Sequence, residues 1–282
     1  MLKMKEYSIS AIRTEYWMPN SNYLDIIVSA LKGKLNDGDL IVISEKALSI
    51  AKGLIIDEKS VKAGFLARIL ACFWMSIIWG YFLGRLCRLR KENIQRLRRY
   101  PCSDGGRHKQ VALRYAGFLE ALLWGSEGGI DGSNLPYAYV CLPLDDPQGD
   151  ADEIRLYIRS RLGKKVAVMI VDTDKTYSFR NFHFTHRPVS FDGIHRLPAA
   201  AYILGRMLRL KRRSTPIAIS GIRLDAESAL NIAEAANRAR GFGAGRTVWD
   251  MADRFSVDLT GVTWEMLKRI EHKPIVIVRI RR

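Results

Sequence analysis

The chain has 282 residues and a formal charge of +16, from 45 lysines and arginines against 29 acidic residues. Its hydrophobic content of 48% is enough for a packed core and excludes disorder as the main state. Arginine supplies 29 of the cations and lysine 16, and the planar guanidinium suits phosphate and carboxylate ligands. The composition therefore raises the question of which anion the protein binds: nucleic acid, a membrane surface or a small phosphorylated ligand.

The first sixty residues predict a helix over 22–32 and a strand over 39–44, with the turn Asn36-Asp37-Gly38 between them. The first ten residues contain no apolar core of a secretory signal. We therefore expect a cytoplasmic protein whose cysteines are free thiols. No Cys-x-x-Cys pair is present, which argues against a zinc site; the cysteines are Cys72, Cys87, Cys102 and Cys141.

An apolar segment from Ile69 to Gly84 contains no charge over 16 residues. A membrane span needs roughly 20 apolar residues, so the segment favours a buried or interfacial helix and no transmembrane span. A peripheral membrane helix and a homodimer interface are the alternatives. The segment 85–99 follows as a predicted basic helix, which is either a solvated face or an anion-binding one.

The remaining pattern predicts an α+β fold, with a mixed β-sheet and packed helices, as one unit over 1–282 in which 64–99 is an inserted helical or interface element. The predicted elements are a connection over 100–109, a helix over 110–123, a glycine-rich loop over 124–136, a helix over 151–162, a strand over 166–171, an irregular polar segment over 172–187, a helix over 197–210, a strand over 216–220, a helix from Asp225 to Gly241, a helix over 262–272 and a strand over 275–280.

Two loops place acids where they could meet a ligand. Three glycines surround Asp131, which lets the backbone approach a ligand, and its carboxylate is a hard donor suited to Mg²⁺ or Mn²⁺. Asp172 and Thr173 follow the buried strand, with Lys175 placed to meet a phosphate. A tight turn at Asp131 and a cap or Asx-turn at Asp172 are the structural alternatives.

Generic nucleotide motifs are missing: the chain has neither a P-loop nor a G-x-G-x-x-G fingerprint between a strand and a helix. The glycine-rich loop from Gly241 to Gly245, flanked by arginines, would either cradle a phosphate or form a mobile turn. His183 and His186 are expected to be exposed or hydrogen-bonded, and no catalytic nucleophile is apparent.

Four segments in order resemble the coenzyme F420-0:γ-glutamyl ligase family. The specific part is GGIDGSN, residues 128–134, followed by VMIVDT, residues 168–173. DGDLIVISEKALSIAKG, residues 37–53, and TPIAISG, residues 215–221, are similar to the family's strands in more common patterns.

The resemblance implies a GTP- and divalent-metal-dependent ligase that adds L-glutamate to an F420-0-like acceptor through an acyl phosphate. We also expect a homodimer. The metal ligands would be Asp131, Asp172 and Thr173. The GTP-binding residues would be Ser44, Lys46, Asn134, Gly241, Gly243 and Gly245, with Trp17-Met18-Pro19 near the family's N-terminal nucleotide-contacting segment.

The chain departs from the family in having Ser49-Ile50-Ala51-Lys52 where the family continues Ser-Lys-x-Glu, and Asp174-Lys175-Thr176 where it has Phe-Gly-Arg. A ligase-like protein with another acceptor is therefore one alternative. A nucleic-acid-binding protein that uses the basic clusters at 85–99 and 206–213 is the other, although no nucleic-acid-binding motif with interleaved aromatic residues is present.

Overall fold

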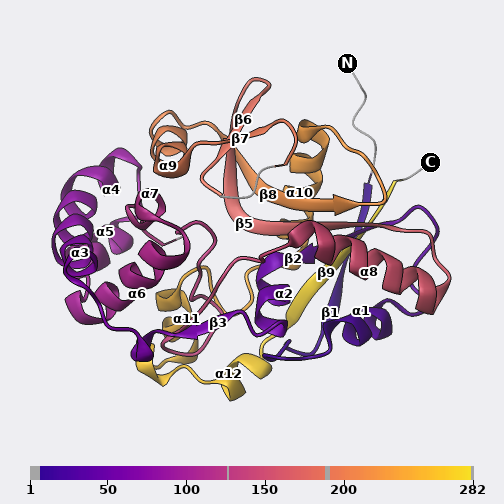
Figure 1. The fold of residues 1–282 in the computed structure, drawn as a ribbon, viewed down its shortest axis with the longest axis horizontal. Helices are drawn as coiled ribbons and strands as arrows, with labels where there is room; N and C mark the ends of the chain where they lie inside the picture. Colours follow the sequence, from indigo (N-terminus) through magenta and orange to yellow (C-terminus); the bar gives the residue numbers. More distant parts are fainter. Residues whose placement is uncertain (1–6, 126, 188–190, 281–282) are drawn as a thin grey trace.

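The computed structural model describes residues 7–125, 127–187 and 191–280, and a mixed β-sheet forms its centre (Figure 1). In that sheet the strand order is β1-β9-β2-β5-β6-β7, and β8 also pairs with β5. β2 runs parallel to β5, whereas β9 is antiparallel to β2. The predicted α+β class is confirmed. The strands are β1 (Tyr7–Thr14), β2 (Leu40–Ser44), β3 (Ile55–Asp57), β4 (Tyr139–Cys141), β5 (Ala167–Phe179), β6 (Phe182–Thr185), β7 (Ile194–Arg196), β8 (Lys211–Ser220) and β9 (His272–Ile280), with β3 and β4 forming a separate small sheet.

The helices begin and end where local capping chemistry allows. α10 begins after Asp225, whose side chain accepts a hydrogen bond from the Ser228 N–H, and ends at Gly241 with φ +76°, as predicted. The helices are α1 (Tyr23–Leu31), α2 (Glu45–Ala51), α3 (Phe65–Ile69), the π-helix η2 (Leu70–Leu83), α4 (Gly84–Leu86), α5 (Lys91–Arg98), α6 (Cys102–Tyr115), α7 (Phe118–Ala121), α8 (Pro147–Leu162), α9 (Pro198–Met207), α10 (Ala226–Arg240), α11 (Val248–Phe255) and α12 (Trp264–Lys268), together with the short 3₁₀ turns η1 (Glu58–Ser60) and η3 (Leu259–Gly261).

Both faces of the central sheet are covered. Successive strand residues point to opposite faces, so Ile41 and Ile43 pack against α1 and α8 while Val42 packs against α10. The same alternation in β5 sends Ile170 to the first face and Met169 to the second. Burial on both sides explains why β2 and the first half of β5 are continuous apolar runs.

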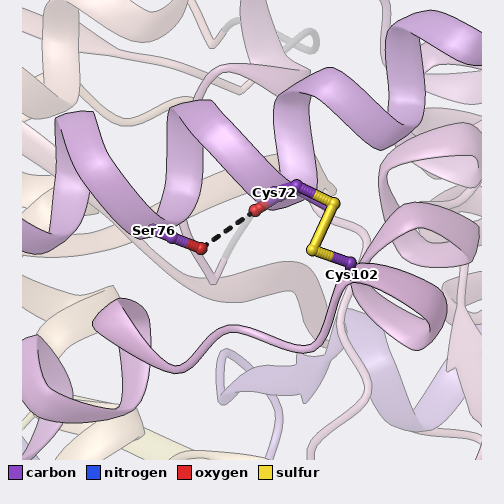
Figure 2. Close-up of a disulfide and its surroundings, with 4 residues drawn as sticks. Cys72, Ser76 and Cys102 are labelled. Atoms are coloured by element: carbon purple, nitrogen blue, oxygen red, sulfur yellow. Dashed lines mark hydrogen bonds between the residues drawn. A yellow bond between two sulfur atoms is a disulfide. The ribbon is translucent and has the colours of Figure 1, made fainter.

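Helices α3 to α7 form a lobe beside the sheet (Figure 1), where two smaller apolar clusters are buried. A disulfide between Cys72 of η2 and Cys102 of α6 joins two of its helices (Figure 2). The expectation of four free thiols is therefore wrong for this pair, and Cys87 and Cys141 are free and buried.

Three local predictions are wrong. The segment 100–109 is not a connection, because α6 begins at Cys102, and the helix predicted over 110–123 is divided between α6 and α7. The segment 85–99 is not one helix, since α4 ends at Leu86 and α5 begins at Lys91. The segment 172–187 is not irregular, because β5 continues to Phe179 and β6 follows.

The continuous helix over Phe65–Leu86, which comprises α3, η2 and α4, is long and apolar enough to cross a membrane by length and composition. One third of its most apolar window is buried inside the protein. A core helix of a soluble protein meets the same criterion, so this observation is weak evidence for a span.

Candidate functional site

A cavity of about 770 Å³ lies beside the carboxyl end of β2 and the middle of its parallel partner β5. Segments that are far apart in the sequence meet in its wall. The lining includes all the predicted metal and GTP ligands outside the Trp17-Met18-Pro19 segment: Ser44, Lys46, Asp131, Asn134, Asp172, Thr173, Gly241, Gly243 and Gly245.

A β-bulge shapes one wall of the cavity. In the pairing of β5 with β8, Asp172 lies opposite Thr215 and Lys175 lies opposite Ser214, so Thr173 and Asp174 are extra residues. Both extra residues line the cavity. Bulges occur often beside active sites because they redirect side chains without ending the strand. Asp172 and Thr173 are therefore presented by a bulge within β5, not by its end.

Asp131 is held by both of its carboxylate oxygens. Its Oδ2 forms an ion pair with the Lys46 ammonium, and its Oδ1 accepts a hydrogen bond from the Ser133 N–H at 2.6 Å. Lys46 Nζ also donates to Ser133 Oγ at 2.6 Å. The tight turn at Asp131 is thus present, together with a cation beside the carboxylate. Burial would lower the pKa of Lys46, but the Asp131 carboxylate raises it, which keeps the lysine charged.

Arg187 is fully buried and connects three segments around the site. Its Nη2 donates to both Glu45 carboxylate oxygens at 2.6 and 2.8 Å, and its Nη1 donates to the Gly128 carbonyl at 2.5 Å. Its Nε lies 3.2 Å from Asp172 Oδ2. A Cβ on Gly129 would lie 1.3 Å from Nη1, so this glycine makes room for the arginine and not, as predicted, for a ligand.

The Asp172 carboxyl is in an unfavourable setting for a negative charge. Burial raises its pKa well above the ordinary value, and the nearby Asp174 carboxylate raises it further, while Arg187 opposes both effects. Asp172 Oδ2 accepts no hydrogen bond from the described residues. A cation supplied by a ligand would stabilise the ionised form.

The donor set fits a metal ion that shares its coordination with a phosphate. Among residues 7–125, 127–187 and 191–280, no group of three or more His, Cys, Asp or Glu side chains is arranged to hold a metal. Magnesium is usually held by one or two carboxylates plus waters and phosphate oxygens, and Asp131 and Asp172 supply two. The Thr173 hydroxyl lies 3.5 Å from Asp172 Oδ1. Asp172 Oδ2 contacts Arg187 Nε without forming a hydrogen bond, which is consistent with this use.

Asn134 fixes the glycine loop against the Asp131 loop. Its Oδ1 accepts from the Ala244 N–H at 2.6 Å, and its Nδ2 donates to the Gly245 carbonyl at 3.2 Å. A Cβ on Gly243 would lie 2.5 Å from Asn134 Oδ1, and φ at Gly243 is +59°. The Asn134 amide therefore positions the loop, because its polar atoms already bind backbone groups.

Positive side chains surround the acids. Two of them, Arg206 and Arg212, belong to the 206–213 cluster. Burial lowers the pKa of Arg240 to about 10, although Asp172 opposes that effect. Lys175 forms an ion pair with Glu234 at 2.9 Å. The cations of the lining are Lys46, Lys175, Arg206, Arg212, Arg238, Arg240, Arg246 and Lys273.

The F420-0:gamma-glutamyl ligase family model matches residues 11–279. The chain belongs to this family. It is also 34% identical over 283 residues to Uncharacterized protein MJ1361 of Methanocaldococcus jannaschii, an alignment that covers 96% of this chain and 95% of the relative. Membership in the gamma-glutamyl ligase family supports an enzymatic role as a ligase, in coenzyme F420 biosynthesis.

The ligase cavity also contains residues that the sequence did not indicate. Trp17 is buried in the core, whereas its neighbour Tyr16 lines the cavity and donates to the Asn134 carbonyl at 2.5 Å. His272 lines the cavity too, and burial lowers its pKa to about 4. The resemblance indicated the segment Trp17-Met18-Pro19, which begins one residue after Tyr16. No local pattern in the sequence marks His272.

The two histidines of the polar segment are hydrogen-bonded, as expected. His183 Nδ1 is 2.9 Å from Ser178 Oγ, and His186 Nε2 is 3.3 Å from Asp174 Oδ2. His186 therefore supports an acid of the bulge without lining the ligase cavity.

A second cavity of about 220 Å³ adjoins the first. The two share four lining residues, namely Gly125, Asp131, Ser133 and Arg246. The second cavity is mostly apolar and rich in aromatic rings, which come from Tyr100, Trp124, Tyr137, Tyr139 and Trp249. The loop that carries Asp131 and Ser133 therefore lies between a charged cavity and an aromatic one.

Proposed function

We propose that the protein is a GTP- and divalent-metal-dependent amide ligase that adds L-glutamate to a carboxylate of a coenzyme F420-0-like acceptor. The observation that supports this most strongly is the meeting of Asp131 with Asp172 and Thr173 in one cation-lined cavity. Acids that hold a metal and cations that hold phosphates are the two components that phosphoryl transfer needs. Family membership supports the ligase part of the proposal.

In the proposed reaction, an acceptor carboxylate oxygen attacks the γ-phosphorus of GTP, and the bond between that phosphorus and the oxygen of the GDP leaving group breaks. The glutamate amine then attacks the carbonyl carbon of the acyl phosphate and loses a proton. The carbon–oxygen bond to phosphate breaks, so that an amide and inorganic phosphate result.

The chain's own residues would bind and orient these substrates. Ser44, Lys46 and the backbone of the 241–245 loop would contact GTP, and Asn134 would hold that loop in place. Mg²⁺ or Mn²⁺ would be held by Asp131, Asp172 and Thr173, where it supplies charge neutralisation between the phosphates and the carboxylates. Arg187 would keep Asp172 in position.

The aromatic cavity is the proposed acceptor site. A planar acceptor would lie against its rings and place a carboxylate near Asp131 and Ser133, where the two cavities join. Another acceptor of the same shape would also fit, which keeps a ligase with a different acceptor as the second possibility. GTP and glutamate are cytoplasmic metabolites, so we place the protein in the cytoplasm, and we expect a homodimer.

Thermal unfolding tests the proposal. GTP with Mn²⁺, at about one hundred times its dissociation constant, should raise the melting temperature by about 5 °C. Asp172→Asn should remove this increase because the metal loses a carboxylate ligand. Asp145→Asn replaces an exposed acid outside both cavities and should keep the increase.

Catalysis is then tested with GTP, Mn²⁺, L-glutamate and F420-0, by searching for a product heavier by one glutamyl unit. An unchanged melting temperature with every nucleoside triphosphate would contradict nucleotide binding. A nucleotide-dependent increase without product would instead contradict the acceptor.

A further inference from the structure

The long helix of the lateral lobe exposes an apolar stripe. Six of its exposed apolar residues recur every four or five positions, a spacing close to the wide turn of a π-helix, so they lie on one side, with the exposed Leu66 and Tyr81 beside them. Phe65 is 83% exposed, Phe73 51% and Phe82 65%. The stripe consists of Phe65, Ile69, Phe73, Ile77, Phe82 and Leu86.

The opposite side of the helix is fixed to the protein. Trp74 Nε1 and Trp79 Nε1 both donate to the Leu122 carbonyl, at 2.8 and 2.7 Å. Cys72 is bonded to Cys102, and Arg98 Nε donates to the Gly80 carbonyl at 3.0 Å. A lone membrane-spanning helix would be surrounded by lipid, whereas this helix packs along one side against α5 and α6, which favours an interfacial position over a span.

The charged residues of the segment that carries the stripe are all cations, and the nearest acids in the sequence, Glu58 and Glu92, adjoin it. Residues 59–91 contain seven cations and no acid, over 33 positions. The cations flank the apolar stripe at both ends, and all of them are exposed: Lys59, Lys62, Arg68, Arg85, Arg88, Arg90 and Lys91. The function proposed above does not use these residues, since none of them lines either cavity.

The apolar stripe and the cations beside it together favour one kind of binding partner. A second copy of the chain would bring two acid-free cationic segments together, and the repulsion would oppose pairing. An anionic membrane surface instead attracts the flanking cations, which lie at headgroup level while the aromatic side chains enter the acyl boundary. We propose that the stripe docks the protein flat on an anionic lipid bilayer.

Vesicle sedimentation with the full-length protein tests this docking. Phosphatidylcholine vesicles with about 30% phosphatidylglycerol should bind the protein, and pure phosphatidylcholine should bind it much more weakly. Phe73→Glu combined with Phe82→Glu should reduce binding at least about tenfold, because each change places a charge in the acyl boundary. The matched control is Leu156→Glu combined with Phe179→Glu, at two exposed apolar positions of other elements, and it should bind normally.

The melting temperature and its increase with GTP and Mn²⁺ show whether each variant is folded, and both changed residues are exposed, so the fold should survive. Equal binding by the stripe variant and the control would overturn the proposal. So would a wild-type dimer that ignores vesicles and dissociates in the stripe variant, because a second copy would then be the occupant. Failure of GTP binding in every protein would affect the proposed function alone.

Discussion

At the scale of single residues, Arg187 joins three segments that local sequence pattern treats separately. It binds Glu45 at the start of α2, the Gly128 carbonyl and the bulge at Asp172. Removal of one partner from such a buried pair leaves an uncompensated charge, which is strongly destabilising. The Arg187 guanidinium is therefore needed to keep the buried carboxylates of the site paired. Hydrophobic periodicity reports burial of apolar residues and gives no sign of a buried arginine.

A second buried charge cluster lies beside the aromatic cavity. His108 is 2.6 Å from Glu58 and 3.2 Å from Glu127, and Glu127 also pairs with the fully buried Lys109 at 2.6 Å. Burial would lower the pKa of His108, but the two carboxylates raise it to about 10. Burial would raise the pKa of Glu127, but Lys109 and His108 lower it to about 2. His108 and Glu127 are therefore both charged across the neutral range.

His108→Gln should reduce the free energy of unfolding by about 2–4 kcal/mol near pH 6. The folded-state pKa of His108 lies above the unfolded value of about 6.5. Its contribution is therefore complete below pH 6.5 and is lost as the pH rises through about 10. Urea unfolding of both proteins at several pH values should show the difference closing over that window.

The exposed His195 gives the matched control, since His195→Gln should leave stability nearly unchanged at every pH. A difference between wild type and His108→Gln that stays constant from pH 6 to about 10 would contradict the role of the two carboxylates.

At the scale of elements, the sequence predicted strands where burial on both faces makes them continuous apolar runs, as in β2 and the first half of β5. It predicted α10 because Asp225 and Gly241 mark both ends. The failures have a common cause in tertiary contacts. α6 contains Gly105 because a Cβ there would lie 2.1 Å from the Tyr100 ring, so packing overrides helix propensity.

The second half of β5 was missed because its residues are polar. Thr176 is fully buried and its hydroxyl is 2.9 Å from the Thr215 hydroxyl of β8. Ser178 accepts a hydrogen bond from Arg213 at 2.8 Å. Partners on neighbouring strands satisfy these groups, and a single segment's pattern cannot show that. The predicted site residues do line one cavity, and their roles stay predictions; family motifs indicated them where periodicity could not.

The disulfide between η2 and α6 determines how many cysteines can react with a thiol reagent. The unfolded, unreduced protein should react with a thiol reagent at Cys87 and Cys141 only, and at all four cysteines after reduction. Because the bond closes a loop of 30 residues, the double variant Cys72→Ala with Cys102→Ala should lose about 2–4 kcal/mol of unfolding free energy. Four reactive thiols before reduction, with unchanged stability of the variant, would contradict the bond.

At the scale of the whole molecule, two separate sets of cations stand out. One set of cations lines the large cavity, and another surrounds the apolar stripe on the helical lobe. The two sets suit different anions: a nucleoside triphosphate in the cavity and lipid headgroups at the stripe. A nucleic-acid-binding protein would instead use both sets for one extended polyanion.

Two paired variants separate these functions. Arg212→Gln with Arg246→Gln removes two exposed cavity cations and should weaken GTP binding about tenfold while vesicle binding is unchanged. Arg85→Gln with Arg90→Gln removes two stripe cations and should do the reverse. Titration of a fluorescent GTP analogue and vesicle sedimentation, each at several salt concentrations, measure both effects.

If both pairs instead weakened binding to DNA or RNA and each reduced the dependence of that binding on salt, one continuous basic surface would bind a nucleic acid. The cavity and the stripe would then not be independent anion sites, because neutralising either one would reduce the same binding constant.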